Sequence, residues 1–348
     1  MVEFFEEINS LYKKYLKMLP LDLDPKKIKE IEGWKKNVRP TIFDFSRLIA
    51  AIQKNNNLSE IVRSGFDFDL DNIEPIISLL QKEGYMRLNK NNKYEITNLP
   101  KPNSLRVIKI GIPHFSNPNY DYNQFPCSAE SRTKRVEKLV NDFPHVKSMR
   151  VGLLGDDDLT SLEMALRTNF TPVVFDIDDH VIGIINEFAH KNKLTVNTIE
   201  KDFRKLRKKD IKTSIDTFIT EPPYTINGIS TFLYHGLNLT KIKDRFYLIA
   251  NQMFLGKSGL STILTTLSKS GVYPIEIVPC FNDYPLPKDY RETNDLSAKF
   301  GPLLDTKTLI SSAASLFVFK QIDLKLNKIK AKLDNKYGIY DRYLRFSK

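Results

Sequence analysis

Three consecutive aspartates, Asp156 to Asp158, follow Gly155 at the end of an apolar segment, residues 148–154. Turns that bind a nucleotide at this place are usually rich in glycine, because the backbone must approach a phosphate closely. A phosphate beside three carboxylates would instead be strongly repelled at the low effective dielectric of a pocket. The turn therefore argues against NAD, FAD and ATP, and it favours a cationic ligand such as a sulfonium, an amine or a metal ion. A helix cap would account for Asp158 alone and not for its two neighbours.

Acids also follow the next two apolar segments of the chain. Asp176, with Asp178 as the second choice, follows the second segment, where an acid commonly binds both hydroxyls of a ribose. Asp202, preferred to Glu200, follows the third segment at 194–199 and could accept a hydrogen bond from an adenine amino group. Together these positions predict an adenosine site.

The fourth apolar segment ends in Glu221, Pro222, Pro223 and Tyr224, within DTFITEPPYTING at 216–228. This order resembles the (D/N)PP(Y/F/W) element of amine-modifying methyltransferases. There the first side chain and a proline carbonyl accept hydrogen bonds from an amino nitrogen, and the aromatic ring packs over it and attracts a cation. The nitrogen lone pair is thereby aimed at an electrophilic carbon. The alternative is a plain turn after a strand.

These motifs require elements that bring them together. From Ser128 to about Gln321 the pattern alternates between apolar strands and amphipathic helices, which predicts a doubly wound α/β sheet. Such a sheet binds its ligands outside the carboxyl ends of the strands, where all of the motifs above lie. The expected strands are residues 148–154, 171–176, 194–199, 215–220, 245–249, 273–281 and 314–319.

The N-terminal residues 1–99 predict a different module. Helical patterns at 3–19, from Asp24, at 41–54, 58–64 and 71–83 precede two short strands at 85–88 and 93–97, the order of a winged helix-turn-helix. Such a module binds DNA, mediates dimerisation or covers a substrate. The helix before the hairpin is acidic at its start and contains Pro75, which does not suit phosphate contact.

Composition narrows the class of protein. The 348 residues suffice for about two domains, and 53 basic against 42 acidic residues give a net charge of +11, with basic runs at 201–212 and 324–336. That charge fits an anionic partner or a lysine-rich proteome.

No apolar run approaches the roughly 20 residues of a membrane span and no signal peptide is evident, so we expect a soluble, cytoplasmic protein. Two cysteines without CxxC and five histidines without ligand spacing predict no metal site.

The motifs in this order resemble the branched-chain polyamine synthase family. The resemblance rests on GDDDLTS at 155–161, FDIDD at 175–179, DFRK at 202–205 and DTFITEPPYT at 216–225, and it continues in NQFPCSAES at 123–131, FNDY at 281–284 and FVFKQ at 317–321. It implies a winged-helix-like domain at 1–99, a linker or lid at 100–127, a Rossmann-like, class I methyltransferase-type domain at 128–321 and a basic C-terminal helix or tail at 322–348. It also implies a homodimer.

The implied activity is transfer of an aminopropyl group from decarboxylated S-adenosylmethionine to an amine nitrogen of a spermidine-type polyamine, with release of methylthioadenosine. Asp157, Asp158 and Glu221 would be catalytic. The acceptor would be bound by Asp156, Pro222, Tyr224 and Tyr122, and the donor by Gly155, Asp176, Asp178, Asp202 and Gln124.

The chain departs from the family's pattern in three ways. The family usually has Asp before the two prolines, where this chain has Glu221; many members carry a CxxC pair that is absent here; and a charge of +11 is unusual for a protein that binds a polycation. A second hypothesis is therefore another S-adenosylmethionine-dependent transfer, of a methyl or 3-amino-3-carboxypropyl group, to a small molecule, peptide or nucleic acid. A third is a non-catalytic, winged-helix DNA-binding protein with a ligand-sensing domain.

Overall fold

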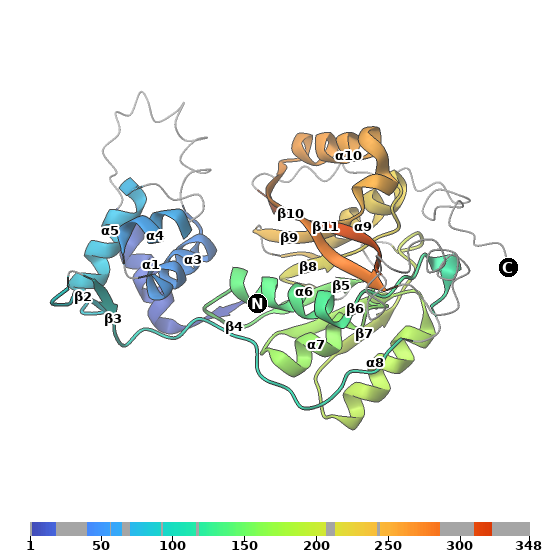
Figure 1. Cartoon of the computed structure of the whole chain (residues 1–348), viewed down its shortest axis with the longest axis horizontal. Helices are drawn as coiled ribbons and strands as arrows, with labels where there is room; N and C mark the ends of the chain where they lie inside the picture. The colour runs from blue at the N-terminus through green and yellow to red at the C-terminus, as the bar shows by residue number, and fades with distance from the viewer. Residues whose placement is uncertain are drawn as a thin grey trace, which may run out of the picture. The chain divides into compact units, whose positions relative to one another are not determined.

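The computed structural model describes residues 2–18, 40–55, 57–64, 70–91, 93–115, 118–206, 213–241, 244–285 and 310–321. The chain divides into two compact units, one of Val2–Leu105 with Glu137–Ser148 and one of Arg106–Val136 with the residues from Met149 onward (Figure 1). The helix expected from Asp24, the end of the basic run at 207–212 and the expected tail at 322–348 lie outside the described residues. The domain boundaries stay predictions.

The N-terminal unit consists of short helices and two small sheets. Its elements are β1 (Glu3–Phe4), α1 (Glu6–Met18), α3 (Ile42–Lys54), α4 (Leu58–Ser64), α5 (Leu70–Lys82), the hairpin strands β2 (Met86–Leu88) and β3 (Tyr94–Ile96), and β4 (Val146–Ser148). Helix α3 begins at a capping box between Thr41 and Asp44. The ring of Phe45 on α3 packs against Tyr15 of α1, with ring centroids 5.4 Å apart. The helices precede the hairpin as expected, and the winged-helix assignment stays a prediction.

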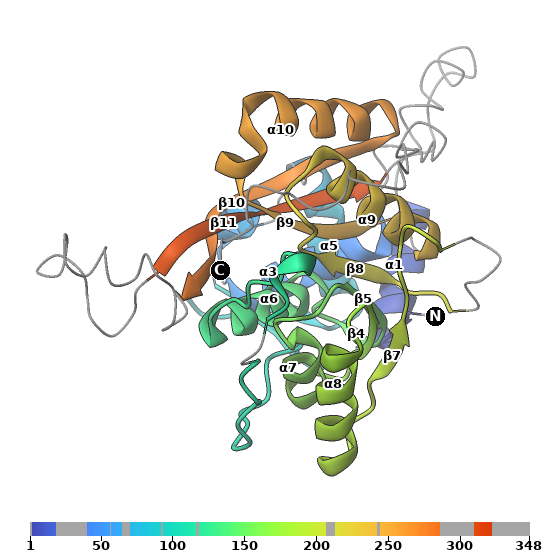
Figure 2. The ribbon, with the colours of Figure 1, turned by 90° about the vertical axis from the view of Figure 1, so that its right-hand side faces the viewer.

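The second unit is built on a seven-stranded sheet with the order β10-β11-β9-β8-β5-β6-β7. Its strands are β5 (Arg150–Leu154), β6 (Thr171–Asp176), β7 (Asn197–Glu200), β8 (Thr217–Thr220), β9 (Arg245–Ala250), β10 (Val272–Pro285) and β11 (Ile310–Gln321). Neighbouring strands from β7 to β9 are parallel, whereas β11 lies antiparallel between β9 and β10 (Figure 2). The predicted α/β class is confirmed.

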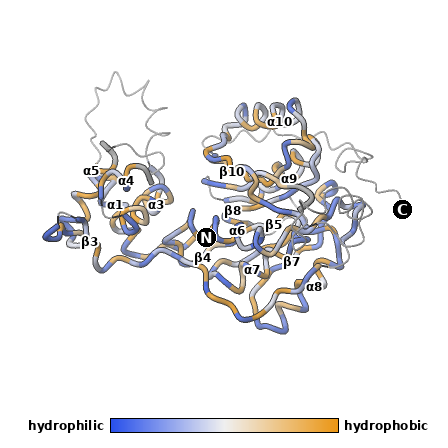
Figure 3. Tube along the Cα trace, viewed as in Figure 1, coloured by the Kyte–Doolittle hydropathy of each residue, from blue (hydrophilic) through white to orange (hydrophobic). Residues whose placement is uncertain are grey.

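Helix α6 (Ala129–Asp142) precedes the sheet in the chain. Its strands are connected by α7 (Thr160–Arg167), α8 (Asp179–Lys191), α9 (Ile226–Leu239) and α10 (Gln252–Lys269), which is kinked at Gly256. Stacked aromatic rings fill the core, with Phe218 4.8 Å from Phe246 and Phe246 5.3 Å from Phe319, centroid to centroid. Apolar residues recur along the strands and on one side of the helices (Figure 3). None of the described helices is both long and apolar enough to cross a membrane.

Some predicted strand bounds were wrong. The expected strand at 148–154 is two strands, because β4 ends at Ser148 and pairs with β1 of the N-terminal unit, and β5 begins at Arg150. β10 runs four residues beyond the predicted end at Phe281, through a polar stretch that alternating apolar residues could not indicate.

The sheet order reverses at β5. The chain proceeds from β5 outward to β6 and β7, and it then returns to place β8 on the other side of β5. A crevice outside the carboxyl ends of the strands is expected at such a switch point. The turns after β5 and β8, which carry the aspartates and the EPPY residues, therefore face each other.

Candidate active site

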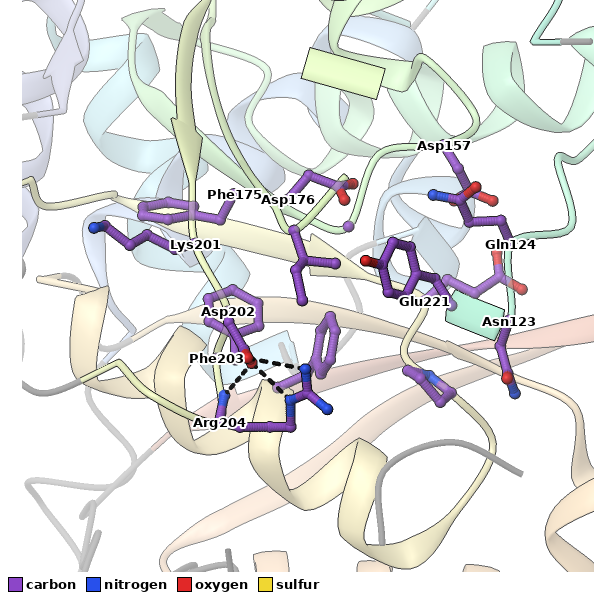
Figure 4. Close-up of a pocket in the computed structure, with 15 residues that line it drawn as sticks. Asn123, Gln124, Asp157, Phe175, Asp176, Lys201, Asp202, Phe203, Arg204 and Glu221 are labelled. Carbon is purple, nitrogen blue, oxygen red and sulfur yellow. Dashed lines mark hydrogen bonds and ion pairs between the residues drawn. The ribbon is translucent and has the colours of Figure 1, made fainter. Parts of the chain in front are cut away.

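A pocket lies at this edge of the sheet (Figure 4). Of the residues predicted from the sequence, it is lined by Tyr122, Gln124, Gly155, Asp157, Asp176, Asp202 and Glu221. Phe203, Pro223 and Phe232 contribute apolar lining. Figure 4 shows Asp157, Gln124 and Glu221 toward one end, and Lys201, Asp202 and Arg204 toward the other. We call these the acceptor end and the donor end, after the roles that the family resemblance in the sequence implies for them.

Gly155 allows the turn after β5, because its φ of +78° lies in the left-handed region that favours glycine. The turn sends its three aspartates in different directions. Asp157 lines the pocket, and the described residues give its carboxylate one hydrogen bond, donated by the backbone N of Phe125 at 3.0 Å, and no ion pair. Burial raises the pKa of Asp157 well above its usual value, and the charges of nearby carboxylates raise it further.

Asp156 turns away from the pocket. Its carboxylate accepts hydrogen bonds from the backbone N of Ser161, at 3.2 and 3.3 Å, and so holds the turn before α7. Burial raises the pKa of Asp156 to about 8, despite those hydrogen bonds. A group buried in this way has no route to an acceptor in this structure, so nothing in the geometry supports the predicted contact.

Asp158 is committed to an ion pair. Its carboxylate accepts hydrogen bonds from Arg135 on α6 and from the backbone N of Cys127. The same guanidinium forms a second ion pair, with Glu221 at the end of β8. Arg135 is 5% exposed, and although burial alone would lower its pKa, the neighbouring acids raise it, so the side chain stays cationic. Arg135 thus joins the turns after β5 and β8.

Glu221 is held by four donors. Its Oε2 accepts from Arg135 and from Asn282 Nδ2, the latter at 3.2 Å, and its Oε1 accepts from the hydroxyls of Tyr224 and Tyr284. Burial raises the pKa of Glu221, whereas Arg135 and the tyrosine hydroxyls act in the opposite direction. Burial and the charge of Glu221 raise the pKa values of both tyrosines well above normal, which keeps their hydroxyls protonated as donors.

The predicted acceptor residues Tyr224 and Pro222 do not line the described pocket, although the neighbouring Pro223 does. The Tyr224 hydroxyl bonds to Glu221, and the ring stacks against Phe254 with centroids 6.0 Å apart. Tyr122 lines the pocket from a short 3-10 helix, Tyr120–Tyr122. Of the predicted acceptor contacts, Tyr122 is therefore the one that reaches the pocket directly.

Toward the donor end, carboxylates organise backbone turns. Asp176 Oδ2 accepts from the backbone N of Asp156 at 2.9 Å, and its Oδ1 accepts from that of Asp178 at 3.0 Å. Asp178 caps α8 through the backbone N of His180, and its second oxygen accepts from Gln124 Nε2 at 2.8 Å. Asp178 does not line the pocket, so its effect on a ligand would be exerted through Gln124. Burial raises the pKa of Asp176.

Asp202 forms a two-pronged ion pair with Arg204, with nitrogen–oxygen distances of 2.8 and 2.9 Å (Figure 4). Burial by itself would raise the pKa of Asp202, but the hydrogen bonds and charge of Arg204 outweigh it and lower the pKa. Asp202 is thus an ionised hydrogen-bond acceptor at the pocket wall. Within the described residues, no group of three or more His, Cys, Asp or Glu side chains is arranged to hold a metal ion.

The sequence reasoning missed Arg135, Asn282 and Tyr284 as members of the site. The motif FNDY at 281–284 carries no predicted role, although its polar residues lie at the carboxyl end of a strand, which is the signal that could have marked them. Arg135 lies in a helix with many charged residues, SRTKRVEK at 131–138, and nothing in that pattern marks it as the buried one.

The strand order and the position of the pocket define the class I methyltransferase type of α/β protein. The C-terminal domain family of branched-chain polyamine synthase A matches residues 113–332, more than half of the chain. The chain therefore belongs to the branched-chain polyamine synthase family.

Individual proteins resemble the chain over shorter stretches. An uncharacterised protein of Methanocaldococcus jannaschii is 32% identical over 160 residues, 45% of this chain and 40% of that protein. The N(4)-bis(aminopropyl)spermidine synthase of the same organism is 35% identical over 131 residues, 37% of this chain and 37% of that protein. The matched part thus spans less than half of the length of each of these curated relatives.

A solved structure is similar over nearly the whole chain. The branched-chain polyamine synthase of Thermus thermophilus, crystallised with N4-aminopropylspermidine and 5'-methylthioadenosine, has a TM-score of 0.51 and 18% identity, covering 91% of this chain and 100% of that one. At this identity the likeness shows the fold.

Proposed function

We propose that this chain transfers an aminopropyl group from decarboxylated S-adenosylmethionine to an amine nitrogen of a spermidine-type polyamine or a related amine. The observation that carries the proposal is the charge of the acceptor end, where both Asp157 and Glu221 line the pocket. Carboxylates there attract a sulfonium and an amine, and they repel anionic co-substrates. The names of the Methanocaldococcus and Thermus relatives support the same activity.

The donor end suits an adenosine. Asp176 would accept from the ribose hydroxyls, and the ionised Asp202 from the adenine amino group, beside the apolar surfaces of Phe203 and Phe232. Gln124, fixed by Asp178, would orient the ribose from the other side. This arrangement fits 5'-methylthioadenosine as the leaving product.

The transfer itself is one displacement. The nitrogen lone pair forms the new N–C bond while the C–S bond breaks, and that bonding pair leaves on the sulfur of methylthioadenosine. The proton lost by the nitrogen goes to the carboxylate of Asp157. A base works best with a pKa near the operating pH, and burial has moved Asp157 in that direction. Glu221 would orient the acceptor, because it lines the pocket and its carboxylate is already paired with Arg135. Asp158 would act indirectly, as the buried second partner of the same arginine.

The positions of the basic side chains favour decarboxylated over intact S-adenosylmethionine as the donor. Those that line the described pocket, Lys201 and Arg204, lie toward the donor end, and Arg135 is already paired with two carboxylates. The carboxylate of intact S-adenosylmethionine would approach Asp157 without a compensating cation among the described residues. The decarboxylated donor avoids this repulsion.

Product analysis tests the proposal. The protein is incubated with the decarboxylated or the intact donor, each with spermidine, and mass spectrometry follows the nucleoside and the amine. We expect methylthioadenosine from the decarboxylated donor and an aminopropyl mass gain on spermidine. Glu187→Gln, an exposed acid on α8, serves as a control that retains activity. Methylthioadenosine from the intact donor would indicate aminocarboxypropyl transfer instead, and S-adenosylhomocysteine a methyltransferase; either result would contradict the proposal.

A further inference from the structure

Helix α6, the turns after β5 and β8, and strand β10 meet at Glu221. Arg135 of α6 bonds to a residue of each of the other three. The start of α6 is tied to β10 by hydrogen bonds from the backbone N of Ser128 to the carbonyl of Asp283, at 2.8 Å, and from the backbone N of Asp283 to the hydroxyl of Ser131, at 2.7 Å. This link brings Arg135, one turn further along α6, beside Asn282.

Asn282 connects Arg135 to Glu221 through hydrogen bonds. It is fully buried; its Oδ1 accepts from Arg135 Nε at 3.3 Å, and its Nδ2 donates to Glu221 Oε2 at 3.2 Å. Two partners of Arg135, Asp158 and Asn282, are buried, but the side chain of the third, Glu221, is 18% exposed and lines the pocket. Among the described residues of this network, Glu221 is the one that lines the pocket.

Charge explains why the network needs a cation. Without Arg135, the carboxylates of Asp158 and Glu221 would be buried together, and like charges at close range favour protonation of one of them. A protonated Glu221 would lose its attraction for an amine and would donate a hydrogen bond where it should accept one. The donors Tyr224, Tyr284 and Asn282 also stabilise the ionised form, but none of them carries a positive charge.

We propose that Arg135 is a positioning residue of the site, which holds Glu221 ionised and directed into the pocket by pairing it with Asp158. This inference rests on the proposed function for its role in acceptor binding. The groups that face Glu221 are Arg135 from α6, Asp158 from the turn after β5, Tyr224 from its own turn, and Tyr284 and Asn282 from β10. Cys127 and Asp157 lie at the edge of the same cluster.

The experiment measures ionisation of Glu221 without requiring turnover. The protein is labelled with glutamate carrying carbon-13 at the side-chain carboxyl, and the signal of Glu221 is identified by its loss in Glu221→Gln. Its titration is followed by NMR in the wild type, Arg135→Met and Arg135→Lys. Aspartates carry no label, so Asp157 and Asp158 do not contribute signals.

We expect the midpoint of Glu221 to rise by about one pH unit or more in Arg135→Met, because an opposite charge at this range shifts a carboxyl by roughly 1–3 units. Arg135→Lys keeps the charge and should restore a midpoint near that of the wild type. Arg47→Met removes a buried arginine paired with Asp44 in the N-terminal unit and should leave the Glu221 signal unchanged. An unchanged midpoint in Arg135→Met, or equal shifts in the Lys and Met variants, would overturn the proposal.

Two further measurements keep the inference testable. Where Arg135→Met does not fold, Tyr284→Phe removes one donor to Glu221 and should raise the midpoint in the same direction by a smaller amount; no rise would count against the network. In the turnover assay, the acid limb of kcat/KM should move to higher pH in Arg135→Met, because the charge of Arg135 lowers the pKa values of both Glu221 and Asp157. A purely structural role would lower the rate equally at every pH. Absence of turnover in the wild type would contradict the proposed function and leave the NMR result as the test of Arg135.

Discussion

The two ends of the pocket are organised by different kinds of partner. At the donor end, Asp176 and Asp178 bind backbone N–H groups of residues 2 to 20 positions away in the chain. At the acceptor end, Glu221 binds side chains that are 61 to 86 positions away, on α6 and β10, as well as Tyr224 from its own turn. Backbone N–H groups thus hold Asp176, and Asp178 also accepts from the distant side chain of Gln124. Glu221 is instead held by side chains, most of them from distant elements.

The difference has a chemical consequence. Backbone N–H groups fix the position of a carboxylate without pairing it with a cation, so the charge of an ionised Asp176 is not cancelled by an ion pair. Arg135 does add a charge, and it leaves Asp157 as the carboxylate of its turn that lines the pocket and has no ion pair among the described residues. The comparison therefore supports the proposal that Asp157 takes the proton and Glu221 orients the acceptor.

Replacement of Asp157 should have the largest effect. In Asp157→Asn, the side-chain oxygen can still accept from Phe125 N, so the local loop should survive, but the base is lost. Removal of a general base lowers turnover by about 10²–10⁴-fold. We expect such a fall in kcat, with methylthioadenosine affinity within a few-fold of wild type by calorimetry. A variant that retained near-wild-type kcat would contradict the assignment of the base.

Replacement of Asp176 should affect the donor end instead. The loss of charge-assisted hydrogen bonds in Asp176→Ala, at about 1.5–3 kcal/mol, should weaken methylthioadenosine binding by roughly 10–100-fold. Asp179→Ala, an exposed acid at the start of α8, is the matched control. Calorimetric titration gives both affinities, and thermal unfolding checks that each variant is folded. If acceptor KM rose while nucleoside affinity held, the two ends would have been assigned in reverse.

The rate should rise with pH through the raised pKa of Asp157. Burial favours its neutral form, and the base must be ionised to accept a proton, so activity is absent below that pKa and appears above it. A profile of kcat/KM from pH 5 to 9 should show this rising step, and the Asp157→Asn profile should lack it while keeping any step that belongs to the acceptor ammonium. A rate that increased toward acid pH would have the wrong sign for a carboxylate base.

Asp156 should matter for stability more than for turnover. Its pKa of about 8 in the fold exceeds the usual value of roughly 4 in the unfolded chain. The folded state therefore holds the proton more tightly, and this stabilisation is complete below pH ~4 and is lost as the pH rises through about 8. Asp156→Asn should have a flatter dependence of Tm on pH than wild type between these limits, with kcat changed little. Parallel Tm curves would show that Asp156 does not titrate in this way.

The sequence predicted the parts of the fold and site that depend on local pattern. Alternation of strands and helices was sufficient to bring the turns after β5, β6 and β8 to one edge of the sheet. It could not say which aspartate of the first turn faces the pocket, because that depends on backbone angles such as the φ of +78° at Gly155 and 58° at Leu159.

The remaining features depend on contacts between distant segments. Asn282 and Tyr284 lie where β10 loses its apolar alternation, so the predicted strand ended before them. Arg135 became a buried residue only through the ion pairs that it forms with Asp158 and Glu221. The EPPY motif predicts that Tyr224 contacts the acceptor, but it does not show that the Tyr224 hydroxyl bonds to Glu221, because that bond depends on how the turn packs.

Calorimetric binding of the two donors tests the central claim most directly, because the claim is that the acceptor end selects a cationic chain. Decarboxylated and intact S-adenosylmethionine are titrated into the wild type and Asp157→Asn, at a pH above the midpoint of the Asp157 step in the rate profile, where its carboxylate is charged. The wild type should bind the decarboxylated donor at least about tenfold more tightly, as expected for one carboxylate pair at an effective dielectric near 20. The preference should shrink in Asp157→Asn. Equal or tighter binding of the intact donor by the wild type would contradict the account.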